Sequence, residues 1–101
     1  MAYLLQVDFK HEGPYGDEMA DVYSDLAKSI NEEPGFLWKI WTENQHSNEA
    51  GGIYIFETKE DAEKYVDKHT KRLSGFGITN ANMKIFEIND KLSQITQSPL
   101  K

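Results

Sequence analysis

Residues 34–56 read PGFLWKIWTENQHSNEAGGIYIF and include both tryptophans of the chain. In a strand, period-two alternation places Phe36, Trp38 and Ile40 on one face. Trp41 then points to the opposite face, so both faces of this strand are apolar. A sheet with two apolar faces needs a cover on each, and a chain of 101 residues has enough helix for one. We expect the second cover to be a partner chain, or a ligand pocket shared with it.

The hydrophobic pattern predicts six elements in the order strand, helix, strand, strand, helix, strand. Alternation of apolar and polar residues places the strands at residues 3–9, 36–43, 49–57 and 81–88. The loop at residues 44–48 has the length of a hairpin connection. The second and third strands should therefore pair antiparallel.

Both helices are predicted from apolar residues at helical spacing and from their end signals. Asp17 can cap the first helix, whose apolar stripe contains Met19, Val22, Tyr23, Leu26 and Ile30. A capping box at residues 58–61 opens the second helix, whose stripe contains Ala62, Tyr65, Val66, His69 and Leu73. The second helix should end near Gly75.

This order of elements predicts an α+β fold of the ferredoxin-like βαββαβ type, as a single domain over residues 1–101. Right-handed crossovers place two helices on one face of a four-stranded antiparallel sheet. The other face stays bare, and its apolar patch would exceed the roughly 300 to 600 Å² that is usual on monomers. Packing two such sheets face to face removes that patch from water. We expect a homodimer formed through the helix-free sheet face.

Charge and composition exclude several classes of protein. Seventeen acidic and eleven basic residues give a net charge of −6, which repels nucleic-acid phosphates and anionic lipid. The chain has no cysteine, which excludes disulfides and thiolate chemistry and fits a reducing cytosol. The start MAYLLQVDFK lacks a signal-peptide pattern, and no apolar run approaches the ~20 residues of a membrane span. We expect a cytoplasmic protein with no nucleic-acid or membrane partner.

The sequence offers no motif for a metal or a nucleotide cofactor. The histidines, His11, His46 and His69, are far apart in the chain and have no cysteine to assist them. The GFG sequence at residues 75–77 follows a helix, so it is not a dinucleotide-binding loop. We expect no metal and no other cofactor. His11, in a Gly-Pro loop, and His46, in the hairpin loop, are expected at the surface.

Several segments together resemble one known family over essentially the whole chain: GPYGD (13–17), EPGFLWKIWTE (33–43), EAGGIY (49–54), KHTKRL (68–73) and LSQI (92–95). That family is the YdhR family of monooxygenases. The resemblance implies a dimeric α+β barrel, the superfamily whose antibiotic-biosynthesis members oxidise polycyclic phenols with molecular oxygen and without metal or flavin. The implied function is a cofactor-independent monooxygenase acting on an electron-rich aromatic small molecule.

Such chemistry asks for an apolar cavity, a group that takes a phenolic proton and donors that hold the resulting anion. The candidate walls are aromatic residues: Tyr23, Trp38, Trp41, Tyr54, Tyr65 and Phe86. His69 is the candidate base, because it lies on the apolar stripe of the second helix and histidine titrates nearest to neutral pH. Lys39 and Arg72 are the candidates to hold an anion.

Two other functions fit the same residues. Aromatic residues at strand spacing also make ordinary cores, and a buried His69 can simply bond a backbone carbonyl. A protein that binds a hydrophobic small molecule without transforming it would show the same pattern. The third candidate is a haem-handling protein, since haem-degrading relatives in the superfamily use a helix histidine, a first-strand asparagine and a tryptophan. The first strand here offers Gln6 and Asp8 but no asparagine, which counts against that function.

Overall fold

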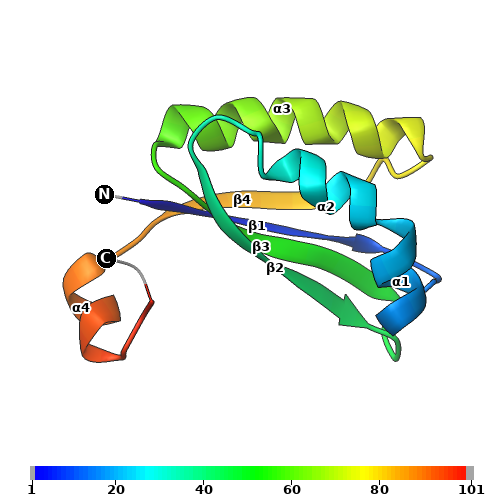
Figure 1. Ribbon diagram of the computed structural model, residues 1–101, viewed down its shortest axis with the longest axis horizontal. Coiled ribbons are helices and arrows are strands. Elements are labelled where there is room, and N and C mark those ends of the chain that lie inside the picture. Colours follow the sequence, from blue (N-terminus) through cyan, green and yellow to red (C-terminus); the bar gives the residue numbers. More distant parts are fainter. Residues whose placement is uncertain (1, 100–101) are drawn as a thin grey trace.

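The computed structural model describes residues 2–99 and has the predicted ferredoxin-like α+β fold. Its strands are β1 (Tyr3–Lys10), β2 (Phe36–Asn44), β3 (Glu49–Phe56) and β4 (Asn82–Glu87). They form one antiparallel sheet in the order β2-β3-β1-β4. Its helices are α1 (Gly16–Val22), α2 (Ser24–Ile30), α3 (Lys59–Gly75) and α4 (Asp90–Ile95). In Figure 1, α1, α2 and α3 cover one face of the sheet, and α4 lies beyond its end on the other side.

The core lies between that covered face and the helices. Leu5 and Val7 of β1 alternate inward as predicted, and both are fully buried. They pack with buried residues of the other elements: Ile30, Tyr54, Phe56, Ala62 and Tyr65. Burial of these side chains is the main favourable term in folding a domain of this size.

A β-bulge in β2 changes which residues share a face. Phe36 pairs with Phe56 and Trp38 pairs with Ile55, so Leu37 is an extra residue between two successive pairs. The side chains of β2 therefore do not alternate strictly between the two faces from Phe36 onward. The expectation that Phe36 shares a face with Trp38 and Ile40 is wrong, because the extra residue shifts the alternation by one.

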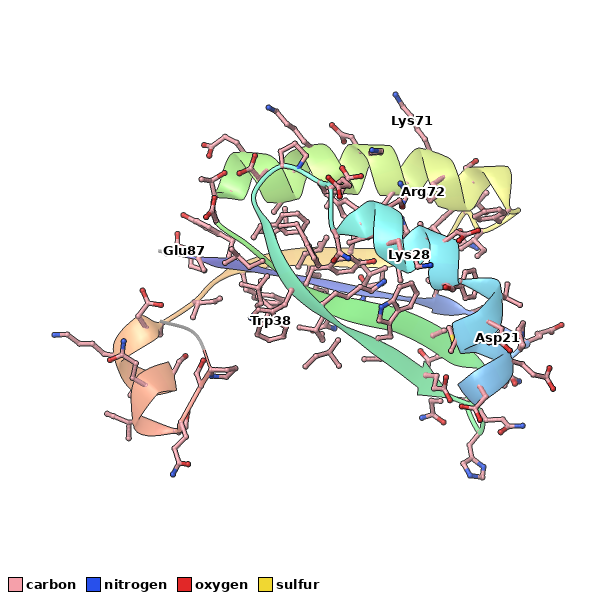
Figure 2. The ribbon with its side chains drawn as sticks, viewed as in Figure 1. Asp21, Lys28, Trp38, Lys71, Arg72 and Glu87 are labelled. Atoms are coloured by element: carbon pink, nitrogen blue, oxygen red, sulfur yellow. The ribbon has the colours of Figure 1, made fainter. Side chains whose placement is uncertain are left out.

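The strand beyond the bulge turns two different side chains toward the helices. Lys39 pairs with Tyr54 and Trp41 pairs with Gly52, which places both on the covered face. Trp38 projects from the opposite side of the sheet (Figure 2). The two tryptophans thus lie on opposite faces, with Trp41 on the side of the helices.

The first predicted helix is divided at Tyr23 into α1 and α2. Tyr23 has φ −100° and ψ 10°, and the chain changes direction there (Figure 1). Val22 is consequently 62% exposed, so its expected place on the buried stripe is wrong. Asp17 does not cap the helix; the carboxylate oxygens of Glu43 on β2 instead accept from the Gly16 N–H, each at 3.1 Å. This bond ties the start of α1 to the sheet.

Helix α3 follows its prediction closely. Thr58 is the N-cap, and its hydroxyl oxygen accepts from the Asp61 N–H at 3.1 Å. Four residues of the predicted stripe are buried, Ala62, Tyr65, His69 and Leu73, while Val66 packs against the core. A salt bridge of 2.6 Å from Lys68 to Glu33 joins α3 to the chain after α2.

The helix-free face of the sheet carries a cluster of apolar side chains next to a polar group formed by Gln6, Asp8, Asn82 and Lys84. Its apolar side chains come from all four strands: Leu4, Trp38, Ile40, Ile53, Ile55 and Phe86. Ile40 is 54% exposed and Phe86 is 46% exposed, so the helices leave this face uncovered. Helix α4 on the same side also exposes apolar residues, Leu92 at 62% and Ile95 at 76%. Residues 1, 100 and 101 lie outside the described residues.

A substitution at Gly51 tests how closely β1 and β3 approach each other. A Cβ atom at Gly51 would lie 1.9 Å from the carbonyl oxygen of Val7, so Gly51→Ala should force the two central strands apart. Gly75→Ala is the matched control, because a Cβ there meets nothing within 4 Å. We predict that Gly51→Ala lowers the free energy of unfolding by about 1–3 kcal/mol. Gly75→Ala should leave the free energy of unfolding unchanged or raise it slightly. Urea unfolding measures both, and equal midpoints would contradict the prediction.

Candidate active site

A cavity of about 30 Å³ lies between the sheet and the helices. Its lining residues come from β1, β2 and β3, from the helices that cover the sheet and from the loop after α3: Phe9, Met19, Tyr23, Leu26, Lys39, Trp41, Gly51, Tyr54, His69, Leu73, Phe76 and Ile78. A space of this volume holds one or two water molecules. Its walls are mostly apolar, with few polar groups, which is the composition of a small-molecule site.

An outer groove of about 300 Å³ adjoins this cavity along α1 and α2. Three residues line both spaces, namely Met19, Tyr23 and Trp41. The Tyr23 and Trp41 rings are stacked, with centroids 6.1 Å apart and planes at 25°. This aromatic pair therefore forms the boundary between the outer groove and the inner cavity.

Lys39 extends along the sheet with its amine among aromatic rings. Its Nζ lies 3.2 Å from the centroid of the Trp41 ring and 4.4 Å from that of Tyr54. Gly52 makes this path possible, since a Cβ there would lie 2.4 Å from Lys39 Cε. Burial, with a smaller effect from the positive charge of Arg72, lowers the pKa of Lys39 to about 7.

His69 is buried on α3, as its place on the apolar stripe predicts. Its ring stacks on Tyr65, with centroids 5.1 Å apart, and meets Tyr54 edge-on at 6.3 Å. Its Nδ1 lies 3.4 Å from the Arg72 guanidinium, which can only donate. Burial first, then the charges of Lys39 and Arg72, lower the pKa of His69 to about 4. The imidazole is therefore neutral at pH 7.

Two buried tyrosines complete the polar part of the site. The Tyr65 hydroxyl donates to the Tyr54 hydroxyl oxygen at 3.3 Å. Burial raises the pKa of Tyr54, with a further contribution from Tyr65, and burial also raises the pKa of Tyr65. Both phenols stay protonated at neutral pH. Tyr54 accepts from Tyr65 and so keeps its own hydroxyl proton to donate elsewhere.

The cations of the site have no carboxylate partner. Within residues 2–99 the one ion pair joins Lys68 to Glu33, so neither Lys39 nor Arg72 has an acidic oxygen within 4 Å. Arg72 lies on the side of α3 toward α2, whereas Lys71 points away from the sheet (Figure 2). A chain of net charge −6 thus places two uncompensated basic side chains around an apolar cavity.

The structure brings together most of the side chains that the sequence suggested. Trp41, Tyr54, Tyr23 and His69 line one cavity, and Tyr65 and Arg72 contact His69. Trp38 and Phe86 do not belong to this cavity, because both lie on the helix-free face of the sheet. For Trp38 the cause is the β-bulge. Seven further lining residues were not predicted for the site: Phe9, Met19, Leu26, Gly51, Leu73, Phe76 and Ile78. Met19, Leu26 and Leu73 lie on the predicted helical stripes, which are the only signal that could have indicated them.

His11 lies outside this cavity, but it is not at the surface as expected. It is 8% exposed, and its Nε2 bonds the Pro14 carbonyl oxygen at 2.8 Å. Its ring meets Tyr15 edge-on with centroids 5.4 Å apart. His11 thus holds the loop between β1 and α1 in place. His46 is exposed in the hairpin loop, as predicted.

Lys39 gives the folded protein a testable dependence on pH. Its pKa is 10.5 ordinarily and about 7 in the fold, so the unfolded chain binds more protons between these values. The free energy of unfolding should therefore rise from pH 7 to pH 9. We predict that Lys39→Met loses this rise, while Lys71→Met on the outward side of α3 keeps it. Urea unfolding at pH 7, 8 and 9 measures the slopes, and equal slopes in the wild type and Lys39→Met would refute the prediction.

Among residues 2–99, no helix is long and apolar enough to cross a membrane. The same part of the chain contains no group of three or more His, Cys, Asp or Glu side chains placed to hold a metal ion.

Known proteins provide an independent comparison for this chain. A search of curated proteins found no significant match. Among solved structures, the chain is similar to SnoaB, a cofactor-independent oxygenase from Streptomyces nogalater, with a TM-score of 0.62 and 14% sequence identity. The similarity covers 87% of this chain and 93% of that one, and it shows a shared fold. The family model described as "Putative mono-oxygenase ydhR" matches residues 4–99. The chain therefore belongs to the ydhR family of mono-oxygenases.

Proposed function

We propose that the protein is a cofactor-independent monooxygenase that acts on an electron-rich aromatic small molecule, such as a polycyclic phenol. The observation that carries this proposal is the cavity: aromatic walls surround Lys39, and Arg72 lies beside the cavity against His69. Neither cation has an acidic partner within residues 2–99. An aromatic acid or phenol fits such a site, because its ring contacts the walls and its anion pairs with the cations. Membership of the mono-oxygenase family supports the oxidative chemistry.

The reaction can proceed with electrons from the substrate alone. A substrate of the anthrone type has a CH₂ group opposite its carbonyl in the keto form and is a phenol with a CH at that carbon in the enol form. The phenol loses its hydroxyl proton, and the phenolate passes one electron to dioxygen. The substrate radical and superoxide combine at that carbon and take up a proton to give a hydroperoxide. Loss of water then leaves a carbonyl, so that CH₂ and O₂ become C=O and H₂O. The protein has to remove and return protons at the right steps and to stabilise the anion.

The described side chains match these requirements. Tyr54 can donate its hydroxyl proton to the substrate oxygen, and Arg72 supplies positive charge beside His69. Trp41 provides a wall against which a flat substrate can stack. The inner cavity of about 30 Å³ is too small for a tricyclic substrate, whereas the adjoining groove adds about 300 Å³. Substrate entry therefore requires the Tyr23 and Trp41 rings to separate.

The position of His69 does not favour a haem ligand. The ring lies between Tyr54 and Tyr65, and its Nδ1 is taken by Arg72. A protein that binds an aromatic molecule without transforming it uses the same walls, and oxygen uptake separates it from an enzyme.

Oxygen uptake by the purified protein tests the function. With a tricyclic phenol of the anthrone type, we predict that dioxygen is consumed and a quinone forms without added flavin, nicotinamide or metal, and that a chelator has no effect. Trp41→Phe should lower kcat/KM by about fivefold, since a lost aromatic contact is worth roughly 1 kcal/mol. Trp38→Phe, on the opposite face, is the control and should keep the wild-type value. Binding of the phenol without oxygen uptake would support the non-catalytic alternative.

We also propose that the protein works as a homodimer through the helix-free sheet face. That face carries apolar side chains from all four strands, and the helices of the same chain leave them uncovered. Helix α4 stands beside it with Leu92 and Ile95 exposed. A second copy of the sheet would cover these side chains, at a spacing of about 10 Å between sheets.

A matched pair of charged substitutions tests the dimer. Ile40 on the helix-free face and Val22 on α1 are similarly exposed, at 54% and 62%. Ile40→Glu would bury an unpaired charge in a dimer, which costs several kcal/mol, so it should dissociate the dimer or unfold the chain. Val22→Glu should leave the assembly intact. Sedimentation equilibrium at micromolar concentration measures both, and a monomeric wild type would refute the proposal.

A further inference from the structure

We propose that Lys39, and not His69, is the catalytic residue that takes the phenolic proton and then holds the phenolate. The inference rests on the proposed function and assigns the acid-base step of the same site. The step is a proton transfer: the substrate O–H bond breaks, an Nζ–H bond forms, and a neutral pair becomes an ammonium and a phenolate. The proton can later return from Nζ to the peroxide oxygen, which restores the amine.

The geometry of Lys39 suits this role. Its side chain crosses the sheet over Gly52 and brings Nζ against the Trp41 and Tyr54 rings that line the cavity. No carboxylate within residues 2–99 pairs with it, so no internal anion competes with a bound phenolate. A flat substrate that stacks on Trp41 would place its oxygen within reach of this amine. Burial and the nearby guanidinium favour the neutral amine, which is the form that accepts a proton.

His69 lacks a free lone pair for the same task. Arg72 can only donate, so the Nδ1 atom of His69 accepts, and the proton of the neutral imidazole lies on Nε2. Both ring nitrogens are then occupied. Burial first, and then the positive charges of Lys39 and Arg72, disfavour the addition of a proton to this ring, so the pKa of His69 is lowered. His69 is better suited to orient Arg72 than to act as a base.

The other titratable groups around Lys39 are also unsuited to take the proton. Tyr54 of β3 and Tyr65 of α3 are buried phenols that remain protonated, and they serve as donors. Tyr23, at the break between the helices, stacks on Trp41 at the cavity boundary. Glu43, farther along β2, directs its carboxylate to the Gly16 N–H. Lys39 is thus the group among the residues lining the cavity that is both basic and unpaired.

A coloured probe tests the proton transfer without relying on turnover. A dihydroxyanthraquinone resembles the quinone product, is not itself oxidised, and absorbs at longer wavelength when it ionises. At a pH below its pKa in solution, the wild type should bind the dye and show the ionised band. Lys39→Met should bind the dye in its neutral form. His69→Gln keeps an acceptor for Arg72 and should retain the ionised band.

Kinetics separate a base from a mere positive charge. With the anthrone-type substrate, kcat/KM of the wild type should rise with pH through an apparent pKa near 7, the value at which Lys39 loses its proton. Lys39→Met should lower kcat/KM by about 10² to 10⁴ and remove this rise. Lys39→Arg keeps the charge but cannot accept a proton, so it should be as inactive as Lys39→Met.

The possible outcomes distinguish this inference from the proposed function. Equal dye ionisation in the wild type and Lys39→Met, or full activity in Lys39→Arg, overturns the role of Lys39 even if oxygen uptake persists. A dye that fails to bind, or that stays neutral on the wild type, overturns it as well. A dye that ionises through Lys39 in a protein without oxygen uptake supports the proton transfer and removes the monooxygenase assignment instead.

Discussion

The β-bulge between Phe36 and Trp38 is the constraint on which the site depends. One extra residue in β2 reverses the side-chain alternation beyond it, because alternation in a strand has a period of two. Lys39 and Trp41 thereby face the helices, and Trp38 joins the helix-free face. Without the bulge, the lysine would point away from Tyr54 and His69. A single irregularity thus decides whether this cavity contains an amine.

The glycine pair in β3 makes room for the arrangement that the bulge sets up. Gly51 lets β3 approach β1 so closely that no Cβ atom would fit, and Gly52 leaves space for the stem of Lys39 to cross the sheet. The amine therefore reaches the aromatic rings over a surface without side chains. A residue that contributes no chemical group, Gly52, thus determines the path of the amine that lines the cavity.

The sequence was sufficient for those parts of the fold that depend on local patterns. The alternation of Leu5 and Val7 identified β1, and the Thr58 cap with the stripe through His69 identified α3. The bulge was not predictable in the same way, since it is a property of the pairing between β2 and β3 and leaves no mark in either strand alone. The break at Tyr23 also escaped prediction, because it has neither Gly nor Pro to signal it. Both missed features act directly on the site.

Charge explains why an amine in this position is useful. The chain carries a net charge of −6, which disfavours the approach of anions. Within residues 2–99, Lys39 in the cavity and Arg72 beside it have no acidic partner. In the reaction that we propose, a neutral phenol crosses the field of this net charge, enters between Tyr23 and Trp41, and becomes an anion only on reaching Lys39. The ion pair then forms away from water, where attraction between opposite charges is strongest. Dioxygen is neutral and small, so the same apolar walls admit it to the electron-rich phenolate. On this mechanism the protein confines the reactive anion to the place where it is consumed.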